Sequence, residues 1–153
     1  MATTNQSESL TIHRTFNATP EEVYNAWMDA DQRKQWFVPS NETMSCTQCE
    51  IDPAVDGSYT LTMSNKETGE DYIAIGHFTE LTPHNKIAFT WSWKDRPKSA
   101  QNTHCTIELT PSPCGSQTDM IFTHTQLPDT QSRDDHHKGW TGCFNELVTH
   151  LAV

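Results

Sequence analysis

The sequence predicts an α+β fold in which a curved antiparallel sheet packs against one long C-terminal helix. Between Thr43 and Thr125 the apolar and polar residues alternate or are interrupted by turns, which is typical of β-strands. Residues 129–153 form the one long segment whose apolar side chains recur at helical spacing. Such a helix must bury its apolar face, and the strands offer the largest surface for it. What occupies the space between sheet and helix is therefore the functional question.

Length and composition indicate one domain with an aromatic core. A chain of about 150 residues buries roughly 68–70% of its extended surface on folding. The hydrophobic fraction is only 34%, but five Trp and six Phe place much of the apolar area in large rings. We expect residues 8–153 to form a single domain, preceded by a polar, frayed segment at residues 1–7.

The net charge of −10, from 20 acidic and 10 basic side chains, argues against nucleic acid or a membrane surface as a partner. No stretch is long and apolar enough to span a membrane, and the N-terminal residues lack the pattern of a secretory signal. A cytoplasmic protein is expected. Its oligomeric state does not follow from the sequence.

Five cysteines, an odd number, are scattered along the chain, which favours free thiols. Cys46 and Cys49 have the spacing of a redox or zinc pair, but positions three apart in a regular strand point to opposite faces. No helix follows them to activate a thiol, and Cys105, Cys114 and Cys143 do not form a second pair. We predict no metal site and no cofactor.

The N-terminal elements are a strand and two short helices. Apolar residues alternate from Leu10 to Phe16, and Thr19-Pro20-Glu21-Glu22 has the pattern of a capping box with proline in the first turn. A second short helix is expected at residues 31–37. Pro39 ends it, because the residue before a proline avoids helical dihedral angles.

Six strands are expected next, separated by turn residues rich in Gly, Pro, Asn and Asp. Their predicted limits are 43–51, 58–64, 71–81, 86–94, 103–110 and 117–125. The connections are short and therefore favour antiparallel neighbours. In the fourth of them Ile87, Phe89, Trp91 and Trp93 share a face, and in the last Thr118, Met120, Phe122 and His124 do so.

The order of elements and several strings resemble the START-like (SRPBCC, Bet v 1-like) superfamily, and within it the domain related to the activator of heat-shock protein 90 ATPase. The strings are FNATPEEVYNAWMDADQRKQWF (16–37), DGSYTL (56–61), GHFTELTPHNKIAFTW (76–91) and THTQLPD…GW…LVTHL (123–151). The resemblance implies a helix-grip fold, in which a seven-stranded antiparallel sheet wraps a long C-terminal helix. It also implies a cavity for an apolar small molecule between them.

Aromatic side chains are the main candidates for the wall of such a cavity, since ligand pockets are mostly apolar. Trp27 and Phe89 are expected in the core. Along the C-terminal helix we assign Phe144, Leu147, Val148 and Leu151 to packing. Gly139, Trp140 and Cys143 are assigned to the part that faces a ligand, and the small Gly139 beside the large Trp140 is expected to set the volume of the pocket. The predicted ligand-binding residues are Trp36, Phe37, Tyr59, His77, Trp91, Trp93, Phe122, His124, Gly139, Trp140 and Cys143.

Two histidines and one tyrosine are the acid–base candidates. In the family a histidine at the position of His124 faces inward, where it could hold a carbonyl or transfer a proton, although a core histidine bonded to the backbone is the simpler interpretation. His77 could approach it across the sheet, and Tyr59 is the other catalytic candidate. His136 and His137 diverge by about 100° on a helix and are expected to be solvated.

Three functions remain open from the sequence. The leading hypothesis is a non-enzymatic domain that binds a hydrophobic small molecule or lipid. The second is a partner that stimulates a heat-shock protein 90 ATPase, following the name-giving member of the family. The third is an enzyme of the polyketide cyclase or dehydratase kind that uses His124 or Tyr59.

Overall fold

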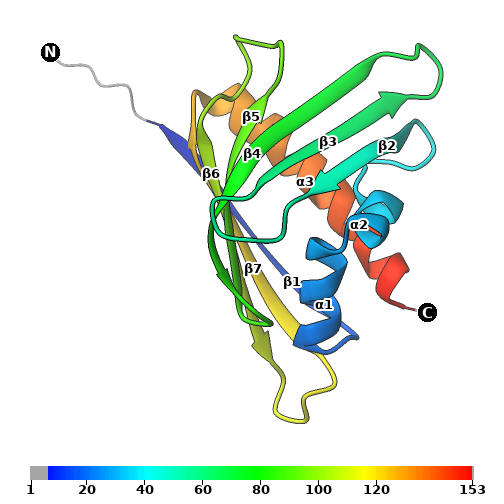
Figure 1. The fold of residues 1–153 in the computed structure, drawn as a ribbon, viewed down its shortest axis with the longest axis vertical. Coiled ribbons are helices and arrows are strands. Elements are labelled where there is room, and N and C mark those ends of the chain that lie inside the picture. The colour runs from blue at the N-terminus through cyan, green and yellow to red at the C-terminus, as the bar shows by residue number, and fades with distance from the viewer. Residues whose placement is uncertain (1–6, 153) are drawn as a thin grey trace, which may run out of the picture.

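The computed structural model describes residues 7–152, which form a seven-stranded antiparallel sheet and three helices in the predicted order (Figure 1). The elements are β1 (Glu8–Phe16), α1 (Pro20–Met28), α2 (Ala30–Trp36), β2 (Met44–Ile51), β3 (Ser58–Asn65), β4 (Asp71–Thr82), β5 (Lys86–Trp93), β6 (Thr103–Pro111), β7 (Thr118–Leu127) and α3 (Thr130–Leu151). The predicted fraying of residues 1–7 lies outside the described residues except for Ser7, as does Val153 at the end of the predicted helix.

The sheet has the strand order β1-β7-β6-β5-β4-β3-β2, so the first strand pairs with the last and chain neighbours pair elsewhere. In Figure 1 the sheet curves around α3, and α1 and α2 lie beside the C-terminal half of that helix. A hydrogen bond between the side chains of His150 and Gln32 joins α3 to α2 at that end. This is the predicted helix-grip arrangement.

Helix α1 begins with the predicted capping box. Thr19 is the N-cap, and its Oγ1 accepts a hydrogen bond from the backbone N of Glu22 at 3.2 Å. The Glu22 carboxylate in turn accepts from the backbone N of Thr19 at 2.9 Å. Asp29 then ends α1 and caps α2, accepting from Asp31 N at 2.9 Å. One acidic side chain therefore fixes the bend between the two short helices.

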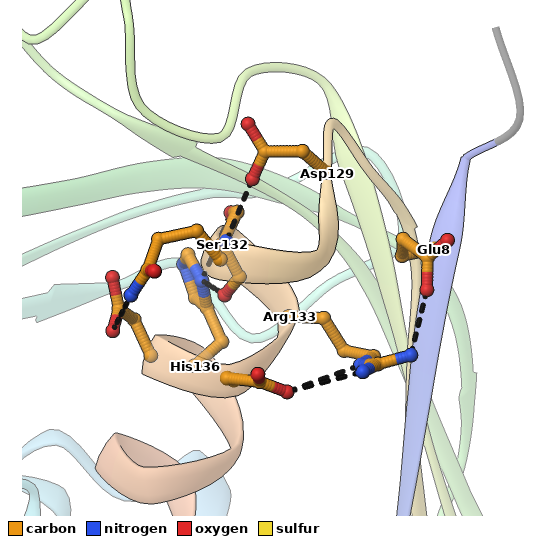
Figure 2. Close-up of polar contacts among 8 residues, drawn as sticks. Glu8, Asp129, Ser132, Arg133 and His136 are labelled. Atoms are coloured by element: carbon orange, nitrogen blue, oxygen red, sulfur yellow. Dashed lines mark hydrogen bonds and ion pairs between the residues drawn. The ribbon is translucent and has the colours of Figure 1, made fainter.

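Helix α3 is anchored at its start to the edge strand β1. Asp129 caps it by accepting a hydrogen bond from Ser132 N at 2.7 Å, and the Arg133 guanidinium donates to the Glu8 carboxylate at 2.7 Å (Figure 2). Arg133 also pairs with Asp134 at 3.2 Å. These contacts hold the first turn of the helix over the sheet.

The core is built around aromatic rings, as the composition predicts. Trp27 is fully buried, and its ring centroid lies 5.0 Å from that of Trp36, 5.9 Å from Phe144 and 6.4 Å from Phe122. These rings come from α1, α2, β7 and α3. Trp27 therefore joins the short helices, the sheet and the long helix into one packed layer.

Two local predictions are wrong. Val148 was expected to pack in the core, but 38% of its surface is exposed. The buried face of α3 is narrow and includes its neighbour Leu147 but not Val148. Cys46 and Cys49 do not point to opposite faces. The register of β2 shifts between Cys46 and Gln48, so Thr47 is an extra residue in a β-bulge, and both cysteines pack on the core side.

Candidate functional site: an aromatic pocket between sheet and C-terminal helix

A cavity of about 400 Å³ lies between the sheet and α3. It receives side chains from the α2–β2 connection, from β2 to β5, from the β5–β6 connection and from α3. The lining residues are Phe37, Pro39, Met44, Met63, Tyr72, Trp91, Trp93, Ser99, Asp135, His136, Gly139, Trp140 and Cys143. This volume falls within the roughly 300–1,000 Å³ of small-molecule pockets.

Tilted and edge-to-face aromatic rings pack together on one side of the cavity. The ring centroid of Trp140 lies 4.9 Å from Trp91 and 5.5 Å from Phe37, and Trp93 meets Trp91 edge to face at 5.2 Å. All of these residues were predicted from the sequence as ligand contacts. The structure also places Gly139 and Cys143 on the wall, so six of the predicted residues come together there.

Two glycines of α3 have opposite roles at the cavity. A Cβ added at Gly139 would meet no atom within 4 Å, so this position borders open space. A Cβ at Gly142 would lie 2.1 Å from the Pro39 carbonyl oxygen. Gly142 thus permits the close approach of α3 to the α2–β2 connection, and Gly139 leaves room in the pocket.

His124 belongs to a buried chain of hydrogen bonds behind the pocket wall. Trp140 Nε1 donates to His124 Nδ1 at 3.1 Å, and because an indole nitrogen can only donate, Nδ1 must be the acceptor. The proton of the neutral ring is then on Nε2, which lies 2.8 Å from Thr103 Oγ1. Thr103 donates onward to the Trp91 carbonyl at 2.8 Å. Both ring nitrogens are therefore occupied.

This network keeps His124 neutral and out of reach of a ligand. Burial is the main cause that lowers the pKa of His124 to about 3, and the neighbouring His136 and His104 act in the same direction. The side chain is fully buried and absent from the cavity wall. His124 is a core histidine, as the simpler interpretation expected, but its partners are the side chains of Trp140 and Thr103 and not the backbone. This geometry gives no support to its predicted role as a ligand-binding or acid–base residue.

Four further predicted site residues also lie away from the cavity. Tyr59 is buried and donates its hydroxyl to the Thr90 carbonyl at 2.5 Å, while burial raises its pKa well above the usual value. Trp36 and Phe122 are fully buried core rings. His77 is exposed on the outer face of the sheet, where its Nδ1 lies 3.3 Å from Thr90 Oγ1. Strand alternation separates it from His124.

His136, which was expected to be solvated, lies on the cavity wall. Its Nε2 accepts a hydrogen bond from Trp93 Nε1 at 2.9 Å. Its Nδ1 lies 2.7 Å from the Ser132 carbonyl, a contact that Figure 2 shows. His136, Gly139, Trp140 and Cys143 follow the spacing i, i+3, i+4, i+7 of one helix face. That spacing was the signal that could have found it.

The remaining wall residues come from positions that the sequence did not single out. Met44 and Met63 contribute flexible thioether side chains from β2 and β3, and Tyr72 contributes a ring from β4. The Arg96 guanidinium lies over the Tyr72 ring at 4.3 Å and pairs with Glu70 at 2.9 Å. This arrangement fixes the ring from the solvent side.

The wall carries little charge. Asp135 is the one formally charged lining side chain, and no Lys or Arg is among the residues that line the cavity. The buried Arg33 lies behind the wall, with its guanidinium 4.3 Å from the Phe37 ring centroid and bonded to the Trp27 carbonyl at 3.0 Å. The Phe37 ring separates it from the cavity.

Burial holds the thiols of Cys143 and Cys49 in the protonated form. Burial raises the pKa of the Cys143 thiol far above its usual value and that of Cys49 to about 11. Within residues 7–152, no three His, Cys, Asp or Glu side chains meet in a way that could hold a metal ion. The aromatic rings and thioether side chains on the wall offer mainly apolar contact.

The fold and the pocket together define a helix-grip protein of the START-like type. The chain belongs to the family of activator of Hsp90 ATPase homolog 1-like proteins, whose model matches residues 17–152. The resemblance noted from the sequence is thereby confirmed. The search of curated proteins gave no match.

Solved structures support the same fold. A protein of Chromobacterium violaceum superposes with a TM-score of 0.82 at 24% identity, covering 95% of this chain and 97% of its own. The AHSA1 protein of Silicibacter pomeroyi gives 0.79 at 27% identity, with 95% and 98% covered. A Staphylococcus aureus protein described as of unknown function gives 0.74 at 22% identity, with 96% and 94% covered. Among the described residues, no helix is both long and apolar enough to cross a bilayer.

Proposed function

We propose that the protein is a binding domain for an uncharged hydrophobic small molecule, such as an aromatic compound or a neutral lipid, held between the sheet and α3. The observation that supports this most directly is the cavity of about 400 Å³ with five aromatic rings and two methionines on its wall. Apolar area removed from water contributes roughly 25 cal/mol per Å², so such a wall favours an apolar ligand.

The charge distribution supports an uncharged ligand over an anionic one. A carboxylate, phosphate or sulfonate in the cavity would find no Lys or Arg on the wall, would face a neutral His136 at neutral pH, and would meet Asp135. Burial of an unpaired charge is costly, and the net charge of −10 adds a repulsive long-range field. Fatty acids and acidic lipids are accordingly poor candidates.

Two naphthalene probes of similar shape test this proposal. N-phenyl-1-naphthylamine is uncharged, whereas 1-anilinonaphthalene-8-sulfonate carries a sulfonate on the same ring system. We expect the uncharged probe to bind more tightly, and Asp135→Asn to improve binding of the sulfonate selectively. Native mass spectrometry of freshly purified protein should show a bound or displaceable small molecule. Binding of neither probe, with no molecule detected, would contradict the proposal.

The two alternatives have less support. The family description names activation of the Hsp90 ATPase, and an ATPase assay with the cognate chaperone that shows stimulation would favour that role. The cyclase or dehydratase alternative depended on His124 and Tyr59. Both side chains are hydrogen-bonded within the protein, and neither lines the cavity of about 400 Å³, so the geometry gives this alternative neither of its two catalytic candidates on the wall.

A further inference from the structure

The hydrogen bond from Trp93 to His136 joins the two elements that enclose this part of the pocket, strand β5 and helix α3. Trp93 lies at the end of β5 and His136 in the second turn of α3, and both side chains line the cavity. Their donor and acceptor atoms are 2.9 Å apart. The bond therefore spans from sheet to helix at the pocket wall.

We propose that this bond is a pH-sensitive latch, which holds Trp93 on the pocket wall at neutral pH and releases it when His136 is protonated. The inference rests on the proposed function, because the released wall would bind the apolar ligand less tightly. It adds a means of regulation to that binding.

The chemistry of the two side chains makes the bond depend on protonation. The Trp93 indole nitrogen can only donate, so His136 Nε2 must offer a lone pair. The single proton of the neutral ring is then on Nδ1, which donates to the Ser132 carbonyl at 2.7 Å. A proton from solvent can add only at Nε2. Two N–H groups would then face each other, and the bond to Trp93 would be lost.

The groups around His136 determine whether its pKa lies above or below the usual value. Burial is the main cause that lowers its pKa below the usual value, while the Ser132 carbonyl and the Asp135 carboxylate act in the opposite direction. From β7 the neutral His124 faces it with ring centroids 5.1 Å apart. Arg133 on the preceding turn is paired with Glu8 and Asp134. His136 is therefore neutral, and the latch closed, at neutral pH.

Ligand binding and protonation must then oppose each other. If the ligand prefers the closed latch, its affinity is highest above the pKa of His136. Below that pKa the affinity falls, by at most about tenfold per pH unit for a single titrating group. The bound ligand should lower the pKa of His136 by the same coupling.

The test is a titration of N-phenyl-1-naphthylamine from pH 7.5 to below the midpoint of His136, with circular dichroism at each pH to verify folding. The wild-type affinity should fall severalfold as the pH passes below that midpoint. His136→Gln keeps an acceptor for Trp93 but does not titrate, so its affinity should change little over this range. His137→Gln removes the adjacent exposed histidine and should retain the wild-type profile. A flat wild-type profile, or a wild-type profile in His136→Gln, would overturn the latch.

A readout that needs no ligand separates this inference from the proposed function. In ¹H–¹⁵N spectra the indole resonance of Trp93, assigned with Trp93→Phe, should shift with pH at the midpoint of His136. If the probe never binds but the resonance titrates as expected, the latch exists and the binding function fails. If the probe binds and the resonance does not move with His136, the binding function stands and the latch is wrong.

Discussion

At the scale of single residues, two tryptophans of the pocket wall differ in one hydrogen bond. Trp140 Nε1 donates to His124, whereas the buried Trp91 Nε1 has no partner within the described residues. Trp140→Phe leaves a buried acceptor unsatisfied, which costs about 1–3 kcal/mol, while Trp91→Phe removes an unsatisfied donor. Urea denaturation should therefore show a larger loss of stability for Trp140→Phe. Equal losses would mean that the bond to His124 contributes nothing.

Cys114 is the thiol with the clearest predicted reactivity. It is exposed on the β6–β7 connection, and hydrogen bonds from Ser116 and Ser112 lower its pKa to about 7. A substantial thiolate fraction is then present at neutral pH. Ellman's reagent should modify one thiol quickly in the native protein.

Two variants check the origin of that fast phase. Cys114→Ser should abolish it, and Ser116→Ala should slow it most at pH 7, where the thiolate fraction is most sensitive to the pKa. A fast phase that survives Cys114→Ser would assign the reactive thiol to another cysteine.

At the scale of elements, α3 provides a matched pair of glycine substitutions. Gly139→Ala adds a methyl group in open space and improves helix propensity, so it should stabilise the protein by about 0.5–1 kcal/mol. Gly142→Ala places the same methyl group against the Pro39 carbonyl and should destabilise it by roughly 1–3 kcal/mol. Thermal unfolding measures both. Effects of the same sign would contradict the close approach at Gly142.

The elements also show where sequence reasoning succeeds and where it fails. Gly139, Trp140 and Cys143 were assigned to the pocket because helical spacing fixes which side chains share a face. The bulge at Thr47, which turns Cys46 and Cys49 to one side, has no comparable signal in the residues of β2. A pattern of period two assumes a regular strand, and one extra residue reverses it.

Long-range partners explain the other missed residues. The sequence cannot show that Trp140 and Thr103, from α3 and β6, use both nitrogens of His124. Nor does it show which parts of β2 and β3 curve toward the cavity, and so Met44 and Met63 were not predicted. The strand limits and the capping box depend on local chemistry. The predicted strand limits agree with the structure to within about two residues, and the capping box is formed by the predicted residues.

At the scale of the whole molecule, buried neutral histidines should make the fold sensitive to acid. The pKa of His124 is lowered to about 3, below the usual 6.5, so its contribution to stability is complete above pH 6.5. As the pH falls toward 3, the unfolded chain binds a proton that the folded chain does not. The loss reaches about 4 kcal/mol by pH 3, and His136 adds to it in the same direction.

Chemical denaturation at several pH values checks this contribution. His124→Gln should be less stable than the wild type at pH 7 and should lose less stability on acidification. The carboxylates titrate in both proteins, so the difference between the two curves isolates the histidine. Parallel curves would show that folding does not shift the pKa of His124.

The central claim is that apolar ligands occupy the cavity beside Gly139, and a titration of N-phenyl-1-naphthylamine into two variants tests it most directly. Gly139→Leu extends an apolar side chain into the cavity without meeting protein atoms at its Cβ, whereas Gly139→Ala makes the same change of helix propensity with little filling. We predict that Gly139→Ala binds the probe like the wild type and that Gly139→Leu folds stably but loses at least about tenfold in affinity, equivalent to about 1.4 kcal/mol. Unchanged affinity in a folded Gly139→Leu would contradict the account.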